Sequence, residues 1–360
     1  MGIFMKRRQF ITRSAALVIG APLCGLSHQG HAQTVGTFDA VAEIKKLRIA
    51  SGTFAGGYLI APVGRINWYF TNLGILPMIQ YLNAADLDRY IRTYLDLYLR
   101  RLETNFSIQD INFTTTPTGK IQLVLADSDD SYAATTLSIV ARYLKASQNW
   151  GWWDANKAKL KTMAYRNLAV AIKPNGLSSV FQAPRSQSNS VGYLMDNCEV
   201  YRGLRDYAAL LRARGETVDA NYYDSFATGI TSRISASLFD TARSGFMPSD
   251  ADNIAGTAFY ADTTCQVFPQ AFGLTELSSY FDKGWAYLNR IAPNWEDGRY
   301  DVYPWAVLGF VAAKRGQLIQ AKQQMRLVEN KFAGDRGLAT INEIGFYLRS
   351  KSLLAGRADI

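Results

Sequence analysis

Three aspartates stand at the beginning of a predicted helix near the middle of the chain. Asp127, Asp129 and Asp130 lie between a short alternating segment, residues 120–126, and an apolar-periodic run that continues to Leu144. Carboxylates are favoured at a helix N-terminus, because the exposed N–H groups and the helix dipole stabilise negative charge there. A capping role therefore explains any one of these aspartates. A group of three also supplies the residue type that general acid–base catalysis uses.

Acidic residues recur at the start of two later predicted helices. Asp196 and Glu199 are three residues apart, so on a helix they share one face and one turn. The same spacing fits a capping box, with Asp196 as the N-cap residue and Glu199 as its partner. Asp262 precedes an apolar helix, where it is either an N-cap or a catalytic carboxylate. Because acids recur at the starts of separate helices, we infer that some of them have a functional role in addition to capping.

The N-terminus predicts an exported protein. Two adjacent arginines, Arg7 and Arg8, precede an uncharged stretch, residues 14–26, and a small-residue cleavage site that ends at Ala32. Paired arginines followed by Gln-Phe-Ile resemble a twin-arginine export signal of bacteria. We expect residues 1–32 to be this signal peptide and the mature protein to be periplasmic or secreted. We expect no stable membrane insertion, since a membrane span needs roughly 20 apolar residues.

Removal of the signal peptide changes the composition. The basic residues fall from 39 to 35 against 30 acidic residues, so the net charge falls from +9 to +5. With no dense basic stretch, this charge does not indicate nucleic-acid binding. Both histidines, His28 and His31, lie in the removed segment. A Ser-His-Asp triad, a Cys-His pair and a His-ligated zinc site are then excluded, and acid–base chemistry falls to Asp, Glu, Tyr or Lys.

Cofactor and redox signals are weak. The spacing of Asp127, Asp129 and Asp130 resembles part of a calcium loop, but the glycine and distal glutamate of that loop are missing. We predict no metal and no cofactor. Cys198 and Cys265 can form a disulfide in an oxidising compartment or remain two buried thiols, and the sequence leaves both open. It also leaves the oligomeric state open.

The elements that must position these acids are nearly all helices. An apolar run over residues 65–82 reads as a helix that Pro77 kinks or restarts, and residues 86–104 form a clear amphipathic helix. Further helices are predicted at 130–147, 154–172, 194–213, 217–240, 260–272, 276–292, 301–314, 317–332 and 340–355.

A short hairpin and two long loops complete the pattern. Residues 111–113 and 121–125 alternate around Pro117-Thr118-Gly119, which predicts a β-hairpin. Long loops at 173–193 and 241–259 alternate with tight turns, as expected of antiparallel helical hairpins elaborated at one end. With no linker in the remaining chain, we predict one domain over residues 33–360. Its expected class is an all-α toroid or solenoid with short β-hairpin elaborations.

Three motifs taken together resemble the six-hairpin glycosidase superfamily. They are DSDDSYAAT at 127–135, YLMDNCEVYRGL at 193–204 and FYADTTCQVFPQAFGL at 259–274. The resemblance covers about residues 60–309 and implies an (α/α)6 toroid with a carbohydrate cleft at its long-loop end. The first motif is also similar to a helix start of family-eight endoglucanases. Residues 64–72 correspond to the segment that holds their general acid, a glutamate, and contain no carboxylate.

The resemblance implies a glycoside hydrolase acting on a poly- or oligosaccharide. Such enzymes place two carboxylates on either side of the scissile bond, one protonated and one ionised. We predict that Asp130 and Asp196 form this pair, with Glu199 or Asp262 as the replacement candidate. Aromatic rings and polar groups near the acids suit sugar stacking and hydrogen bonding. The predicted substrate-binding residues are Trp68, Asp127, Tyr132, Tyr193, Asn197, Tyr260, Gln266 and Trp305.

Two other functions fit the same scaffold. A polysaccharide lyase would use a tyrosine as acid and base, with Arg185, Arg202 or Arg205 neutralising a uronate. A non-catalytic glycan-binding protein of an exopolysaccharide system would keep the toroid and lose turnover, and the missing glutamate favours this reading. The sequence determines neither the sugar nor the linkage, nor which carboxylate is the acid.

Overall fold

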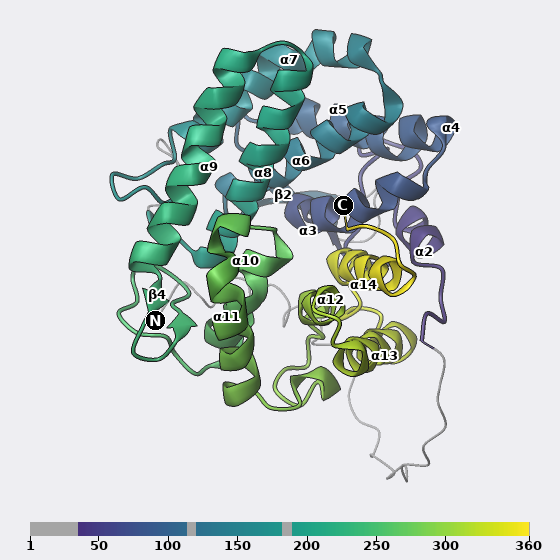
Figure 1. Cartoon of the computed structure of the whole chain (residues 1–360). Helices are drawn as coiled ribbons and strands as arrows, with labels where there is room; N and C mark the ends of the chain where they lie inside the picture. The colour runs from purple at the N-terminus through teal and green to yellow at the C-terminus, as the bar shows by residue number, and fades with distance from the viewer. Residues whose placement is uncertain (1–34, 114–119, 182–188, 360) are drawn as a thin grey trace.

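The computed structural model describes residues 35–113, 120–181 and 189–359. In this part of the chain the helices form a ring of two layers, in which inner and outer helices alternate along the sequence (Figure 1). Each inner helix packs on the next, and the last packs back on the first, which closes the ring. The inner helices are α3 (Trp68–Ile75), α6 (Asp130–Ser147), α8 (Leu194–Ala213), α10 (Phe268–Ala271), α12 (Ala306–Lys314) and α14 (Ile341–Leu354).

The outer layer confirms the predicted all-α (α/α)6 toroid. Its helices pair with the inner helices as antiparallel hairpins, as the tight turns of the sequence predict. The outer helices are α2 (Ala40–Lys46), α5 (Thr93–Arg101), α7 (Trp150–Ala164), α9 (Thr217–Ser237), α11 (Ser278–Ile291) and α13 (Leu318–Gly334).

The two layers differ in how their apolar residues are spaced. The outer helix α9 buries Ala220, Tyr223, Ala227, Ile230 and Ile234, one residue per turn along a single stripe. Such a stripe covers a core on one side and leaves the opposite face to solvent. The inner helices are buried on all sides: residues 130–140 of α6 and 306–312 of α12 are buried without a break. A helix that is buried on all sides has to lie inside, and the inner layer of the ring is where these helices lie.

Glycine residues let the inner helices approach closely. A Cβ atom at Gly203 of α8 would lie 2.5 Å from the backbone oxygen of Ala134 on α6. A Cβ at Gly345 of α14 would lie 2.6 Å from the oxygen of Leu73 on α3. Asp130 lies one turn before Ala134, and Glu199 lies one turn before Gly203. The contact between α6 and α8 therefore brings these two acids together.

Several helices differ in detail from the predicted ranges. The run at 65–82 becomes α3 followed by the 3-10 helix η1 (Leu76–Tyr81), which restarts at Pro77 as expected. The amphipathic helix begins as α4 (Ala84–Asp86) and passes through a π-turn, η2 (Leu87–Arg92), into α5. The remaining short helices are η3 (Tyr165–Ala169), η6 (Thr275–Leu277) and η7 (Trp295–Asp297).

Two predicted helices are shorter than expected. The run at 260–272 is divided into η4 (Phe259–Thr263), η5 (Thr264–Val267) and α10, and Tyr260 near its start has extended backbone angles, φ −107° and ψ 129°. The helix predicted from residue 301 begins only at Ala306. Pro304 restricts the residue before it to extended conformations, and Trp305 is left-handed with φ 53°.

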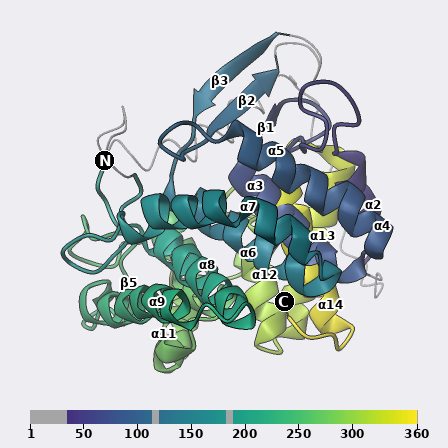
Figure 2. The same cartoon turned by 90° about the horizontal axis from the view of Figure 1, so that it is seen from above.

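Strands make up a small part of the described chain. The predicted hairpin is confirmed as antiparallel β2 (Gln109–Phe113) and β3 (Ile121–Leu125), with Ile111 opposite Leu123. Its turn at Pro117-Thr118-Gly119 lies outside the described residues. The hairpin extends away from the helices (Figure 2), and β1 (Arg65–Ile66) joins its other edge. A second hairpin consists of β4 (Phe239–Asp240) and β5 (Gly245–Phe246).

Two findings concern the cysteines and membranes. Cys198 and Cys265 are buried free thiols, so the structure contains no disulfide between them. Among the described residues, no helix has both the length and the apolar character of a membrane span.

The contact at Gly203 gives a stability prediction. Gly203→Ala should destabilise the fold by about 1–3 kcal/mol, the usual cost of overpacking, because the new methyl group meets the backbone of Ala134 rather than a flexible side chain. The matched control is Gly229→Ala on the outer helix α9, where a Cβ meets nothing within 4 Å. This control should stabilise by up to ~1 kcal/mol through helix propensity. Urea unfolding measures both, and equal effects of the two substitutions would contradict the packing argument.

Candidate active site

The N-terminal ends of the inner helices meet at one end of the ring. Tyr69, at the start of α3, donates a hydrogen bond to Glu199 in the first turns of α8. Its ring also stacks on Tyr132 of α6, with centroids 5.9 Å apart. Across the ring, Glu343 of α14 accepts a hydrogen bond from the N–H of Ala306, the first residue of α12. Free N–H groups and positive dipole ends therefore gather here, and they favour carboxylates.

Three buried carboxylates lie together at this end, and we call them the acid cluster: Asp130, Asp196 and Glu199. Their exposed fractions are 0%, 2% and 1%. Burial raises the pKa of Asp130 well above its usual range, and the neighbouring charges of Asp196 and Glu199 raise it further. The N–H of Ser131, 2.7 Å from Oδ1 of Asp130, acts in the opposite direction. The balance favours a proton on Asp130, the state that a general acid requires.

The surroundings of Asp130 contain buried polar atoms that the protein leaves unsatisfied. In the described chain, Oδ2 of Asp130 and the hydroxyls of Ser128, Ser131 and Ser178 have no hydrogen-bond partner. The Ser178 hydroxyl lies close enough to act on Asp130 as a weak hydrogen-bond donor that lowers its pKa, although the contact falls outside the geometry of a full hydrogen bond. Buried polar groups are normally paired, so a group of exceptions marks a place where water or a polar ligand binds.

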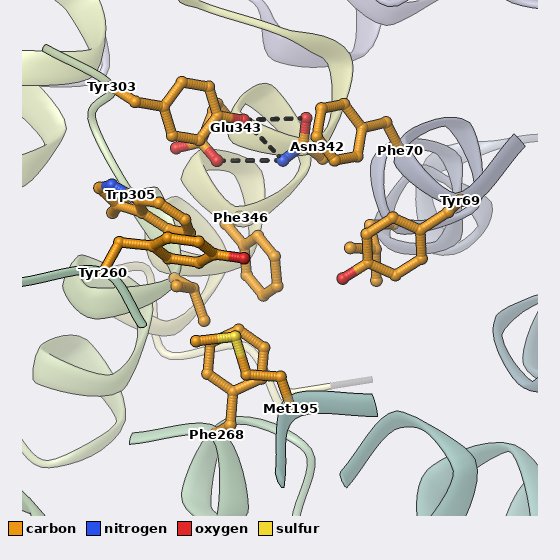
Figure 3. Close-up of a pocket in the computed structure, with 12 residues that line it drawn as sticks. Tyr69, Phe70, Met195, Tyr260, Phe268, Tyr303, Trp305, Asn342, Glu343 and Phe346 are labelled. Carbon is orange, nitrogen blue, oxygen red and sulfur yellow. Dashed lines mark hydrogen bonds between the residues drawn. The ribbon is translucent and has the colours of Figure 1, made fainter. Parts of the chain in front are cut away.

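An aromatic pocket, drawn in Figure 3, lies beside the acid cluster, because its lining includes Tyr69, which donates to Glu199, and Met195, which precedes Asp196. The space inside it that is open to water-sized molecules is about 40 Å3, and five of the six inner helices or the segments just before them contribute to its lining. Trp305 and Tyr260 form one wall, and Tyr69 and Phe70 lie across from them. The lining residues are Tyr69, Phe70, Leu73, Met195, Tyr260, Phe268, Tyr303, Trp305, Val307, Asn342, Glu343 and Phe346.

Glu343 is a carboxylate of this pocket that the sequence reasoning missed. Its side chain is 2% exposed and accepts hydrogen bonds from the N–H of Ala306 at 2.5 Å and from Nδ2 of Asn342 at 3.1 Å. Burial raises its pKa to about 7, against the opposing effect of the Ala306 and Tyr303 hydrogen bonds. Thr340-x-x-Glu343 reads as a capping box, but Thr340 makes no side-chain cap. Glu343 caps the neighbouring helix α12 instead.

A second buried carboxylate, Asp110 of β2, was also missed. It accepts hydrogen bonds from Nδ2 of Asn67 at 2.7 Å, from the N–H of Trp68 at 3.2 Å and from the Tyr132 hydroxyl at 3.0 Å. Burial, reinforced by the charge of Asp127, raises its pKa to about 7, and Arg65 opposes this shift. The first inner helix contributes no acid of its own, and the hairpin supplies one to its N-terminus. An aspartate inside an alternating strand was the available signal.

The predicted catalytic residues are only partly brought together. Asp130, Asp196 and Glu199 form the acid cluster, and their roles stay predictions. The capping-box reading of the latter two is wrong, because α8 begins at Leu194 with Tyr193 as N-cap and so places Asp196 inside the first turn. Asp262 lies in η4, where its Oδ2 accepts a hydrogen bond from the N–H of Ala258 at 2.9 Å, and its catalytic role likewise stays a prediction.

The predicted binding residues divide into two groups. Tyr260 and Trp305 line the aromatic pocket, and Tyr132 and Asp127 lie around Asp110 beside the acid cluster. The others make internal contacts, and their predicted role in binding remains untested. Trp68 is fully buried and donates to the oxygen of Gln109, Asn197 bonds both Ser178 and Tyr193, and Gln266 bonds the backbone of Phe246.

Comparisons with known proteins agree with this geometry at the level of the fold. No protein-family model and no curated sequence matches the chain. A glycosidase solved as a single-residue variant is similar in structure, with a TM-score of 0.61 at 16% identity over 89% of this chain and 96% of its own. The wild-type form of that glycosidase has a TM-score of 0.59 at 14% identity, again over 89% of this chain and 96% of its own. A rhamnosidase from Klebsiella oxytoca with rhamnose bound gives 0.53 at 12% identity, over 84% of this chain and 56% of that one.

These likenesses define the class of fold. The chain is an (α/α)6 helical toroid, the architecture of those glycosidases. Its candidate active site lies at the N-terminal ends of the inner helices, where the acid cluster adjoins the aromatic pocket.

The raised pKa of Glu343 predicts a pH dependence of stability. Between the ordinary glutamate pKa of 4.5 and about 7, the folded protein holds a proton at Glu343 that the unfolded chain releases. Stability from this group is therefore present at low pH and is lost as the pH rises through 7, by an amount on the order of 3 kcal/mol. Glu343→Gln should remove that part of the slope in urea unfolding at pH 4.5 to 8.

The control for this measurement is Asp282→Asn, whose side chain is 90% exposed and should leave the wild-type slope in place. If the free energy of unfolding of Glu343→Gln depends on pH in the same way as that of the wild type, the pH dependence does not come from Glu343.

Proposed function

We propose that this protein is a glycoside hydrolase that acts on a poly- or oligosaccharide. The observation that carries the proposal is the acid cluster beside an aromatic pocket. Glycoside hydrolysis needs a protonated and an ionised carboxyl close together, and aromatic rings that hold a sugar. The fold shared with glycosidases supports the same reading.

The environments of the acids support different roles. Asp130 holds its proton, because burial and the charge of Asp196 both disfavour its ionised form. In the proposed reaction it protonates the leaving glycosidic oxygen. In the same reaction Asp196 acts as the base that activates water or as the nucleophile. Glu199, which Tyr69 holds by a hydrogen bond, balances the charge that develops at the sugar.

The lyase alternative finds less support in the described residues. Arg202 is held by Asp206 at 2.9 Å, and Arg205 is held by Asp224 at 2.9 Å. These arginines already have carboxylate partners in the protein, whereas a lyase would use one to neutralise a uronate. Arg185 lies outside the described residues. The glycan-binding alternative needs the same pocket without turnover, and the activity measurement below separates it from the hydrolase.

Export is part of the same proposal. A hydrolase of external polysaccharide has to reach its substrate, and the twin-arginine pattern with a cleavage site at Ala32 provides a route. Residues 1–34 lie outside the described part of the structure.

The acid cluster gives the activity prediction. On a panel of polysaccharides scored by the release of reducing ends, the wild type should cleave at least one. Asp130→Asn and Asp196→Asn should each lower kcat on that substrate by about 100-fold or more, since a positioned general acid or base typically contributes 100- to 10,000-fold. Thermal unfolding of each variant verifies that the fold is intact.

Asp282→Asn, whose side chain is 90% exposed on the outer helix α11, serves as the matched aspartate control and should keep most of the activity. Full activity in both Asp130→Asn and Asp196→Asn would remove the proposed site. Release of unsaturated products with a new C=C bond would assign the protein to the lyases instead.

A further inference from the structure

The aromatic pocket also carries information about the substrate. We propose that it is a subsite for an uncharged sugar ring, so that the substrate is a neutral glycan rather than a uronate or sulfated one. The inference rests on the proposed function and goes beyond it by naming the class of sugar.

The wall of the pocket is a fixed aromatic platform. The rings of Tyr260 and Trp305 stack with centroids 4.8 Å apart and planes 20° apart. Tyr303 meets Trp305 edge to face at 5.2 Å, and the indole N–H of Trp305 donates to Oδ2 of Asp301 at 3.2 Å. Because these contacts hold the indole from several sides, the platform is formed before a ligand arrives. A flat rigid ring suits the C–H face of a pyranose at low entropic cost.

The polar groups of the pocket are few and converge on one side. Asn342 donates to the Tyr303 hydroxyl at 2.9 Å and to Oε1 of Glu343 at 3.1 Å. The Tyr260 hydroxyl points into the pocket opposite Tyr69 (Figure 3). An apolar cavity with a small set of oriented donors and acceptors is typical of a site for a small polar molecule. The rim hydroxyls of a sugar can pair with these groups while its faces contact the rings.

The charges of the pocket argue against an anionic sugar. No lysine or arginine is among its described lining residues, and Glu343 is its carboxylate. A uronate or sulfate group would have to leave water without a cationic partner, between phenylalanine and methionine side chains, which is costly. It would also face the acid cluster through Met195 and Tyr69, which are the neighbour of Asp196 and the hydrogen-bond donor of Glu199.

The location of the pocket connects it to the reaction. Tyr69 lines the pocket and donates to Glu199, and Met195 lines it immediately before Asp196. A sugar ring on the Trp305 platform therefore extends toward the acid cluster. The pocket selects the sugar, and the acid cluster acts on the bond at its edge.

The test is a binding measurement with matched sugar pairs. Isothermal titration calorimetry on the Asp196→Asn protein, in which turnover is suppressed, uses neutral oligosaccharides and their C6-carboxylate counterparts of the same linkage. The pairs are gluco with glucurono, galacto with galacturono, and manno with mannurono oligosaccharides. At least one neutral member should bind ten-fold or more tightly than its carboxylate partner. Adding Trp305→Ala should weaken that binding at least ten-fold.

Two further variants make the outcome independent of folding defects. Trp150→Ala, at the start of outer helix α7 and outside the pocket, should leave binding unchanged. Glu343→Gln should reduce the discrimination against the carboxylate member by several-fold. The proposal is overturned if no neutral sugar binds, if a carboxylate member binds as tightly as its neutral partner, or if Trp305→Ala leaves neutral-sugar binding intact.

The failure of this inference is distinguishable from the failure of the proposed function. If neutral sugars bind in a way that depends on Trp305 but the wild type does not hydrolyse them, the proposed subsite stands and the proposed hydrolase function is wrong. If the wild type hydrolyses a glycan but Trp305→Ala binds the sugar as tightly as before, the proposed function stands and the proposed subsite is wrong.

Discussion

The close packing of the inner helices is the constraint on which the rest of this molecule depends. Gly203 lets α8 approach the backbone of α6, and Gly345 does the same for α14 and α3. Closing the ring at these contacts gathers the helix N-termini around one axis. The positive ends of the helices then offset part of the cost of burying several carboxylates in a small volume. The acid cluster is therefore a consequence of the ring, because no single helix could hold these acids out of water.

The buried carboxylates fall into two kinds. Asp110 and Glu343 accept hydrogen bonds from the first N–H groups of α3 and α12, so they act as caps supplied by another element. Asp130 keeps an oxygen without a partner, in the company of unpaired serine hydroxyls. The paired acids explain how the helices start, and the partly unsatisfied one marks where a substrate is expected. Whether a buried carboxylate has hydrogen-bond partners for its oxygens therefore distinguishes structural acids from candidate catalytic acids better than its exposed fraction does.

Sequence reasoning predicts the architecture and some of the residues that the structure places at the candidate site. Apolar periodicity gives the helices, and the recurrence of acids at helix starts gives Asp130, Asp196 and Glu199. It does not give Glu343, whose spacing from Thr340 is that of an ordinary capping box, because the side chain turns to a neighbouring helix. It does not give Asp110 either, since the pairing of a strand with the first inner helix is a tertiary contact. The extended backbone at Tyr260 and the left-handed Trp305 likewise follow from packing rather than from local preference.

The central claim is that substrate binds between the aromatic pocket and the acid cluster. A crystal structure of the Asp196→Asn protein with an intact oligosaccharide tests it most directly. The account predicts a sugar ring against Trp305 and a glycosidic oxygen within hydrogen-bond reach of Asp130. A saccharide bound on the outer helices or at the opposite end of the ring, with the acid cluster untouched, would contradict it.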